Sequence, residues 1–351
     1  MERFDAIVVG AGPAGSTAAH RLATAGASVL LLDRARFPRD KPCGGGLTGR
    51  AVRQLPCPVD PVVEDEITRV RLRAGYRGGY ERRSDRPLVL LTQRSRLDAF
   101  LAECAAEAGA DFRDGVRVDE VEGTTVRMNG NRATAEVVLG ADGANGVVGR
   151  SLDLAQEIEH GVALEGNASY DPAYRGTMLL EFGVVPGGYG WLFPKAEHVN
   201  VGVGGWAREG PRLRDHLRRL CDAYGLDPAR VTGLRGHRLP TRRPEAVLAR
   251  GRAAVIGDAA GLVDPFSGDG IYEALLSARL AADAALDVLA GRADGLEPYH
   301  HAVTARLEHL YRWSGRIKRA VDRFPRLSLA VVRVPPLWPV VESVVHGELR
   351  R

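Results

Sequence analysis

A lone thiol, Cys43, stands in the run Lys41-Pro42-Cys43-Gly44-Gly45-Gly46, shortly after an apolar segment at residues 28–32. Proline fixes one backbone angle, and glycines let the backbone come close to a flat ligand. We therefore expect a loop that places a thiol beside a cofactor. Because an ordinary thiol is mostly protonated at neutral pH, Cys43 could position a substrate, donate a proton or pack as a small apolar side chain.

A glycine motif, Gly10-Ala11-Gly12-Pro13-Ala14-Gly15, lies between a strand expected at residues 4–9 and a helix expected at residues 13–25. This is the setting of a dinucleotide fingerprint, in which the first glycine makes a tight turn, the second admits the pyrophosphate and the third allows close helix packing. Asp33, at the end of the next strand, is the acid expected about 20 residues later to accept hydrogen bonds from a ribose. The fingerprint alone is compatible with both FAD and NAD(P).

Two later segments favour FAD. Gly257-Asp258 ends an apolar strand, and a carboxylate there can accept a hydrogen bond from a ribityl hydroxyl. The run Pro265-Phe266-Ser267-Gly268-Asp269-Gly270-Ile271 then begins a helix expected at residues 270–289. The N-terminus of that helix would offer backbone N–H groups and a positive dipole end to an anion. A reduced flavin carries such charge around N1 and O2, so the two segments in this order favour FAD.

Two aromatic side chains, Tyr189 and Trp191, fall in a glycine-punctuated, strand-like stretch at residues 161–206. Residues two apart on a strand point to the same face, so the two rings would stand together. Aromatic faces stabilise a nearby cation by about 0.5–2 kcal/mol, so the two rings could stabilise positive charge that develops on a bound substrate. Simple packing on the strand is the alternative. Lys195, at the strand end, fits a surface role or a place beside the flavin equally well.

Several motifs together resemble a known group of flavoproteins. With the fingerprint and Gly257-Asp258, the helix start at residues 93–98 and the strand end Ala141-Asp142-Gly143 look like those of the para-hydroxybenzoate-hydroxylase type. Within that group, the Cys43 run and the run Tyr189-Gly190-Trp191-Leu192-Phe193-Pro194-Lys195 resemble the geranylgeranyl reductase family. The resemblance covers about residues 4–280.

The resemblance implies an FAD-dependent enzyme that saturates C=C bonds of an isoprenoid chain, geranylgeranyl or polyprenyl, by hydride transfer from flavin N5 and protonation. NADPH or a ferredoxin-type protein is the expected electron donor. Cys43, Tyr189 and Trp191 would be the catalytic residues. The cofactor-binding residues would be Gly10, Gly12, Ala14, Gly15, Asp33, Arg34, Gly44, Gly45, Arg94, Asp142, Gly257, Asp258, Gly268, Gly270 and Ile271.

Two other functions suit the same motifs. An aromatic monooxygenase would use FAD with oxygen and NADPH but has no need of a thiol among glycines, and a non-catalytic flavin-binding lipid carrier would share every motif. The motifs indicate the C=C bond that reacts but not the head group of the substrate. Chlorophyll side chains, ether lipids, menaquinone tails and prenyl diphosphates are therefore all candidate substrates. The oligomeric state is not indicated.

The order of elements predicts an α/β chain, α+β overall, in which a Rossmann-like FAD-binding domain is interrupted by a mostly antiparallel β-sheet substrate domain. A chain of 351 residues with 45% hydrophobic content is long enough for two such domains. We expect the FAD-binding domain at residues 1–65, 92–155 and 245–295, the substrate and catalytic domain at 66–91 and 156–244, and a C-terminal helical segment at 296–351.

The composition indicates a cytoplasmic protein without a metal site. The four cysteines, at positions 43, 57, 104 and 221, lack metal-ligand spacing and are expected to be reduced. A net charge of +4, with arginines at helical spacing, gives no reason to expect nucleic-acid binding. The first strand starts too early for a signal peptide, and prolines and charges interrupt the apolar stretch at residues 327–345. That stretch could lie on a bilayer, so peripheral contact with the inner face of the membrane is a further expectation.

Overall fold

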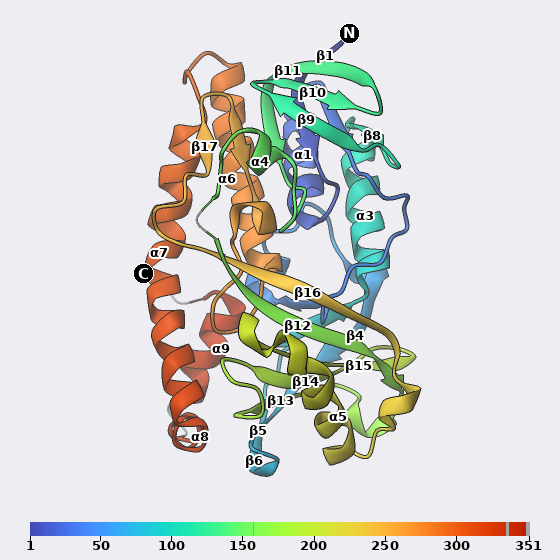
Figure 1. Cartoon of the computed structure of the whole chain (residues 1–351), viewed down its shortest axis with the longest axis vertical. Helices are drawn as coiled ribbons and strands as arrows, with labels where there is room; N and C mark the ends of the chain where they lie inside the picture. The colour runs from blue at the N-terminus through green and yellow to red at the C-terminus, as the bar shows by residue number, and fades with distance from the viewer. Residues whose placement is uncertain (157, 335–336, 349–351) are drawn as a thin grey trace.

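The computed structural model describes residues 1–156, 158–334 and 337–348. It confirms the expected mixed α/β class, with the strands of the described residues in three sheets. In Figure 1 an eight-stranded sheet and its helices occupy the upper half, and a seven-stranded sheet lies below them. Helix α7 (Glu297–Arg323) runs down one side past both sheets.

The eight-stranded sheet carries the glycine fingerprint. Its order is β17-β18-β11-β1-β2-β8, with the ribbon β9-β10 attached to β11, and β1, β2, β8, β11 and β18 are parallel. Its strands are β1 (Glu2–Val9), β2 (Val29–Leu32), β8 (Asp111–Arg113), β9 (Val118–Glu122), β10 (Thr125–Met128), β11 (Asn131–Gly140), β17 (Ala249–Arg250) and β18 (Ala253–Val255). The buried ends of β1 and β2 are continuous apolar runs, as expected of strands covered on both faces. Helix α1 (Pro13–Thr24) packs between α3 (Arg94–Glu107) and α6 (Ile271–Leu289).

The seven-stranded sheet is mostly antiparallel, as expected. Its order is β16-β12-β15-β14-β13-β5-β6, and β13 pairs in parallel with β5. Its strands are β5 (Arg69–Ala74), β6 (Arg77–Arg83), β12 (Ile158–Ser169), β13 (Thr177–Phe182), β14 (Tyr189–Pro194), β15 (His198–Trp206) and β16 (Thr232–Arg242). Along β15, Val199, Val201 and Val203 pack in one core with helix α5 (Leu213–Ala223). The alternate residues of β15 therefore face the opposite side of the sheet.

Residues 41–46, with Cys43 among them, form a loop that we call the thiol loop. A three-stranded antiparallel sheet holds the end of this loop, because its strand β3 (Gly46–Thr48) begins at the last glycine of the loop. Its other strands are β4 (Val63–Ile67) and β7 (Val89–Thr92). The remaining α-helices are α2 (Gly49–Val52), α4 (Val148–Ser151), α8 (Pro325–Val332) and α9 (Trp338–His346). The 3-10 helices among the described residues are η1 (Asp60–Val62), η2 (Pro172–Tyr174), η3 (Ala207–Arg212), η4 (Pro228–Arg230) and η5 (Gly257–Ala260). Within the described ranges, we find no helix with the length and apolarity to cross a membrane.

The expectation of four reduced cysteines is wrong. Cys57 and Cys104 form a disulfide across 47 residues of chain, while Cys43 and Cys221 are free. The bridge ties the segment after α2 to the second half of α3, and the two Cα atoms lie 6.9 Å apart. The fold creates this proximity by packing two elements that are distant in the sequence, and the spacing of the cysteines carries no trace of it.

Close backbone packing dictates the first glycine motif. Gly10 has a φ angle of +103°, a conformation that favours glycine. A Cβ atom on Gly15 would lie 1.7 Å from the carbonyl oxygen of Gly10, whereas a Cβ atom on Gly12 would meet only the ends of two guanidinium groups, at 3.5 and 3.8 Å. Gly15 therefore lets α1 dock on the strand before it, and Gly12 leaves open space at the start of the helix.

Replacing Gly15 by Ala should destabilise the protein by about 3 kcal/mol or more, because the methyl group would be driven into a backbone carbonyl. Gly12→Ala in the same motif is the matched control and should cost no more than about 1 kcal/mol, the usual cost of Ala at a helix N-cap. Denaturant titration gives the free energy of unfolding of both variants. Equal destabilisation of the two would contradict the packing role of Gly15.

Candidate functional site

Two cavities meet at the thiol loop. The smaller, of about 560 Å³, follows the ends of β1 and β2 and the N-terminus of α1. The larger, of about 1010 Å³, lies between the seven-stranded sheet and helices α7 and α9. The residues that line both cavities mark their junction: Cys43, His237, Leu239, Val263, Gly268, Gly270 and Ile271.

The smaller cavity has the donors and acceptors of a dinucleotide site. Helix α1 begins after Gly12 with no side chain capping its N-terminus, so its first N–H groups and the positive end of its dipole are open to an anion. Asp33 accepts hydrogen bonds from the Ala11 N–H at Oδ2 and from the Ala35 N–H at Oδ1, both at 2.9 Å. These bonds fix the carboxylate at the cavity wall, and its remaining lone pairs can accept from a ligand hydroxyl.

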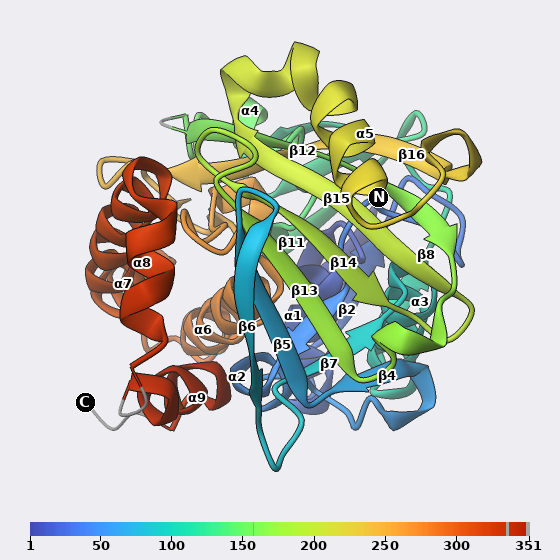
Figure 2. The same ribbon diagram turned by 90° about the horizontal axis from the view of Figure 1, so that it is seen from below.

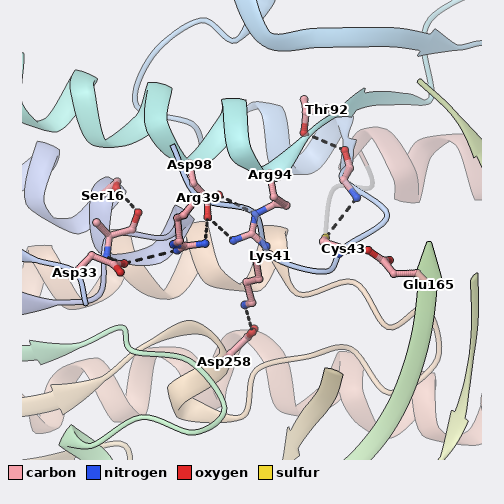
Figure 3. A network of polar contacts seen from close by, with 12 residues as sticks. Ser16, Asp33, Arg39, Lys41, Cys43, Thr92, Arg94, Asp98, Glu165 and Asp258 are labelled. Carbon is pink, nitrogen blue, oxygen red and sulfur yellow. Dashed lines mark hydrogen bonds and ion pairs between the residues drawn. The ribbon is translucent and has the colours of Figure 1, made fainter. Parts of the chain in front are cut away.

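A series of charged side chains, buried or partly buried, runs from this cavity to the thiol loop (Figure 3). Asp98 accepts from Nε and Nη2 of Arg94 at 2.7 and 2.8 Å, and from Arg39 at 2.7 Å. Lys41 Nζ lies 2.7 Å from Asp258 Oδ2. Burial alone would raise the pKa of Asp258, but the Lys41 ammonium and the Arg94 guanidinium hold that pKa below its usual value. Asp258 is therefore kept ionised and bound to the loop.

Asp142, in the wall of the smaller cavity, has one unsatisfied oxygen. Its Oδ2 accepts from the N–H groups of Val147 and Val148, at the start of α4. Its Oδ1 is buried and has no hydrogen-bond partner within the described part of the chain. Burial raises the pKa of this carboxyl group. Because a buried acceptor without a partner is costly, Oδ1 suits a hydrogen-bond donor on a bound ligand.

The thiol loop is fixed from the side of the seven-stranded sheet. The Cys43 N–H donates to Glu165 Oε1 at 2.6 Å, and the Gly45 N–H donates to Cys43 Sγ at 3.3 Å. A Cβ atom on Gly44 would fall 2.7 Å from the ring of Phe193. Only glycine at this position lets the loop lie against the aromatic ring, so the glycines bring the thiol to the junction of the cavities.

Lys195 clamps the same loop, and the surface role considered for it is wrong. The side chain is 3% exposed, and Nζ donates to the carbonyl oxygens of Gly44, at 2.7 Å, and Thr92. Burial lowers the pKa of Lys195 to about 8, although the nearby Cys43 and Glu165 oppose this shift. The ammonium thus holds two backbone segments together from inside the protein.

A row of aromatic rings forms one wall of the larger cavity. Tyr189, Trp191 and Phe193 follow one face of β14, with ring centroids 6.0 Å apart for the first pair and 6.2 Å for the second. Trp191 Nε1 donates to Asn200 Oδ1 at 2.8 Å. A Cβ atom on Gly202 would come within 2.2 Å of the Trp191 ring, so the neighbouring strand makes room for the indole. The predicted catalytic residues Cys43, Tyr189 and Trp191 thus line one cavity together.

Most of the predicted cofactor-binding residues also reach a cavity wall. Gly15 and Gly257 line neither cavity, and a Cβ atom on Gly257 would lie 3.0 Å from the Cβ atom of Ala14, so both glycines serve packing. Arg34 is exposed at the rim. The residues that line one cavity or both are Gly10, Gly12, Ala14, Asp33, Arg34, Gly44, Gly45, Arg94, Asp142, Asp258, Gly268, Gly270 and Ile271.

Three polar wall residues, Arg39, Glu165 and His237, were not among the sequence predictions. Glu165 left one signal in the sequence, a carboxylate directly after the apolar run Val162-Ala163-Leu164. His237 lies at the junction, where burial and the Lys41 charge lower its pKa to about 4. This imidazole is therefore neutral at neutral pH.

Comparison with known proteins agrees with this geometry. Residues 3–173 match the model of the FAD binding domain family. The chain is 37% identical to a geranylgeranyl diphosphate reductase from Rhodobacter capsulatus, over 82% of this chain and 76% of that protein. It is 35% identical to a menaquinone reductase from Mycolicibacterium smegmatis, over 80% of this chain and 76% of that protein. A solved structure of a geranylgeranyl bacteriochlorophyll reductase-like protein from Thermoplasma acidophilum shares the fold, with a TM-score of 0.81 and 24% identity over 92% of this chain and 88% of that one.

The burial of Lys195 should make stability depend on pH. Its pKa is about 8 in the folded protein against 10.5 for an ordinary lysine, so the unfolded chain binds more protons between these values and stability rises with pH across them. The difference in the free energy of unfolding between wild type and Lys195→Met should therefore shift in favour of the wild type by up to about 3 kcal/mol from pH 8 to pH 10.5. Urea titration at both pH values measures this shift. A difference that stays constant would show that the ammonium is not desolvated.

Proposed function

The chain belongs to the geranylgeranyl reductase family of FAD-dependent oxidoreductases, and from this membership we propose that it saturates a C=C bond of an isoprenoid chain. One observation carries the proposal: a large apolar cavity opens onto the cofactor cavity beside Cys43. The names of the two relatives support it, since geranylgeranyl diphosphate and menaquinone both contain isoprenoid chains.

FAD is the cofactor, and the described residues fit it. We assign the pyrophosphate to the open N-terminus of α1 beside Gly12, a ribose to Asp33, the ribityl chain to Asp258 and a ligand donor group to Asp142. The flavin ring would then reach the junction beside Cys43, where its reduced form supplies a hydride. On this assignment the FAD-binding domain comprises residues 1–65, 92–155 and 245–295, and the substrate domain residues 66–91 and 156–244.

The larger cavity suits a long apolar substrate. Its volume of about 1010 Å³ is at the upper end of the range for small-molecule sites, about 300–1,000 Å³. The cavity wall includes many aliphatic side chains, among them Val89, Met178, Leu180, Leu239, Ile317, Val340, Val341 and Val344. Such a lining removes apolar surface from water and favours a hydrocarbon chain over a polar ligand.

The aromatic wall suits the electronic demand of alkene reduction. Positive charge develops on one alkene carbon as the other is protonated, and a cation near an aromatic face gains about 0.5–2 kcal/mol. Tyr189 and Trp191 stand side by side on this wall, in the same cavity as Cys43. We propose that these rings stabilise the developing charge and that the Cys43 loop positions the reacting bond next to the flavin.

Anaerobic incubation of the reduced, FAD-loaded protein with geranylgeranyl diphosphate or with menaquinone should add two hydrogens for each saturated bond, because a hydride and a proton are both transferred. Mass spectrometry of the extracted lipids measures the gain and identifies the accepted head group. Oxidised protein is the control and should leave the lipid masses unchanged. Oxygen-dependent hydroxylation of an aromatic compound, without mass gain on any prenyl lipid, would instead show a monooxygenase, and lipid binding without mass gain would show a carrier.

We also propose that the C-terminal helices contact a membrane that contains anionic lipids. Ten of the twelve exposed large hydrophobic side chains in the described residues fall between residues 310 and 344, and Figure 2 shows helices α7, α8 and α9 together on one side of the molecule. Exposed arginines lie among these apolar residues, at positions 312, 316, 319, 323, 326 and 333. Three of the exposed apolar residues, Ile317, Val340 and Val344, also line the larger cavity, so a lipid chain could enter it from the bilayer.

Replacing Trp313 and Leu327 together by Ser should weaken binding to phosphatidylglycerol vesicles at least tenfold, because burying each such side chain contributes about 1.5–3 kcal/mol. Cosedimentation measures the bound fraction. Val247→Ser is the matched control, since this exposed residue lies outside the helices and should not affect binding. Vesicles of phosphatidylcholine alone should bind the wild type more weakly, and equal binding by all three proteins would argue against this surface.

A further inference from the structure

Glu165 is a buried carboxyl group whose chemistry the assignments above leave unused. It lies on β12 and is 6% exposed. Oε1 accepts from the Cys43 N–H at 2.6 Å, whereas Oε2 has no hydrogen-bond partner among residues the structure describes. The side chain belongs to the wall of the larger cavity and points toward the thiol loop in Figure 3. One carboxyl oxygen thus anchors the loop, and the other is buried without a hydrogen-bond partner in the described part of the chain.

None of the charged groups around Glu165 forms an ion pair with its carboxyl group in the described part of the chain. The titratable and polar groups that face it are Lys195 after β14, Asn200 on β15, Arg235 and His237 on β16, and Asp40 and Cys43 in the loop segment. Arg235 lies opposite on β16, but its guanidinium binds Asp40 at 3.0 Å. The ammonium of Lys195 is committed to two backbone carbonyls. Glu165 therefore has no ion-pair partner within the described residues.

This environment favours the protonated acid. Burial raises the pKa of Glu165, and the Cys43 N–H, the Lys195 charge and the Asn200 amide only partly offset that rise. A neutral carboxyl group is both a donor and an acceptor, so it can keep the bond from Cys43 at one oxygen and carry a proton on the other. The proton would then sit on Oε2, in a side chain that belongs to the wall of the larger cavity.

We propose that Glu165 donates the proton in the reduction of the alkene. This inference rests on the function proposed above. In the step, the O–H bond of Glu165 and the alkene π bond break, and a C–H bond forms at one alkene carbon. The hydride from reduced FAD forms the second C–H bond at the other carbon and brings both electrons. Glu165 is left as a carboxylate and takes up a proton from water before the next turnover.

Most other acids near the aromatic wall are already engaged. The Tyr189 hydroxyl donates to the Ser267 carbonyl oxygen, and the Trp191 N–H donates to Asn200. Lys195 does not line the larger cavity. The Tyr311 hydroxyl lines the same cavity without a hydrogen-bond partner within the described ranges, but burial raises the pKa of Tyr311 and makes it a weaker acid. The Cys43 thiol is the rival in the loop itself, because its sulfur accepts a hydrogen bond from the backbone and its proton is uncommitted among the described contacts. A test must therefore separate the carboxyl group from the thiol.

Glu165→Gln separates the proton from the structural role, because glutamine keeps an oxygen that can accept from the Cys43 N–H but has no acidic proton. With reduced, FAD-loaded protein and the prenyl lipid that the wild type saturates, the single-turnover rate should fall about 10²-fold or more, while FAD affinity and KM stay near their wild-type values. Glu165→Asp should recover part of the rate. Glu209→Gln is the matched control, since Glu209 is also buried but lines neither cavity.

The pH profile and an infrared spectrum provide readouts that a structural role would not move. Only the protonated acid can donate, so the wild-type rate should fall as pH rises through the pKa of Glu165, and Glu165→Gln should lose this dependence. The infrared difference between the two proteins at neutral pH should contain the carbonyl stretch of a protonated carboxyl group.

Several results would overturn the assignment. A Glu165→Gln variant with the wild-type rate and pH profile, or an infrared difference without the protonated carboxyl band, would leave Glu165 only its contact with the loop. Loss of the pH dependence in Cys43→Ala but not in Glu165→Gln would make the thiol the donor. Wild-type protein that saturates no prenyl lipid would instead refute the proposed function itself.

Discussion

The site depends on holding one short loop at the place where two sheets meet. Lys41 binds Asp258, which follows strand β18 of the eight-stranded sheet, the Cys43 N–H binds Glu165 on the seven-stranded sheet, and the Gly44 carbonyl binds Lys195. These partners are 217, 122 and 151 residues away along the chain, so the position of the loop is determined by the whole fold. The bonds made by Lys41 and Lys195 involve ionised groups and are therefore stronger than neutral ones, and the bond to Glu165 fixes the loop to the seven-stranded sheet. The junction of the two cavities is therefore held firmly at several points.

The wall opposite the loop depends on glycines as much as on the aromatic residues that they contact. The Phe193 ring fills the space that a side chain on Gly44 would occupy, and the Trp191 indole fills the space above Gly202. The rings can occupy these places along β14 only because the loop and the next strand carry glycines at these two points. The glycines and the aromatic residues are thus one packing arrangement, although they come from three separate segments of the chain.

The sequence predicted what depends on neighbouring residues and missed what depends on distant ones. The α/β class, the family and FAD are confirmed, because the fingerprint around Gly10 is read from consecutive residues in a strand, a turn and a helix. The Cys57 to Cys104 bridge and the burial of Lys195 escaped prediction, since each depends on contacts between segments far apart in the sequence. Glu165 was missed for the same reason, because alternation along its strand shows which face it occupies but not which loop covers that face. The roles of individual residues toward FAD and substrate stay predictions.

The same loop gives two carboxyl groups, one partly buried and one buried, opposite properties. Lys41 offers Asp258 a full positive charge, which offsets the cost of burial and lowers the pKa, so this group stays ionised and can accept hydrogen bonds from a cofactor. Two residues later, Cys43 offers Glu165 only a neutral N–H, which anchors the side chain without offsetting the cost of burying a charge, and the pKa is raised. Two carboxyl groups whose pKa values differ in this way can take different roles: the ionised one can bind a ligand, and the protonated one can give up a proton. The difference in pKa here arises because the Lys41 ammonium contacts Asp258 and the Cys43 N–H contacts Glu165. A shift of the loop along its own direction would therefore disturb both carboxyl groups at once.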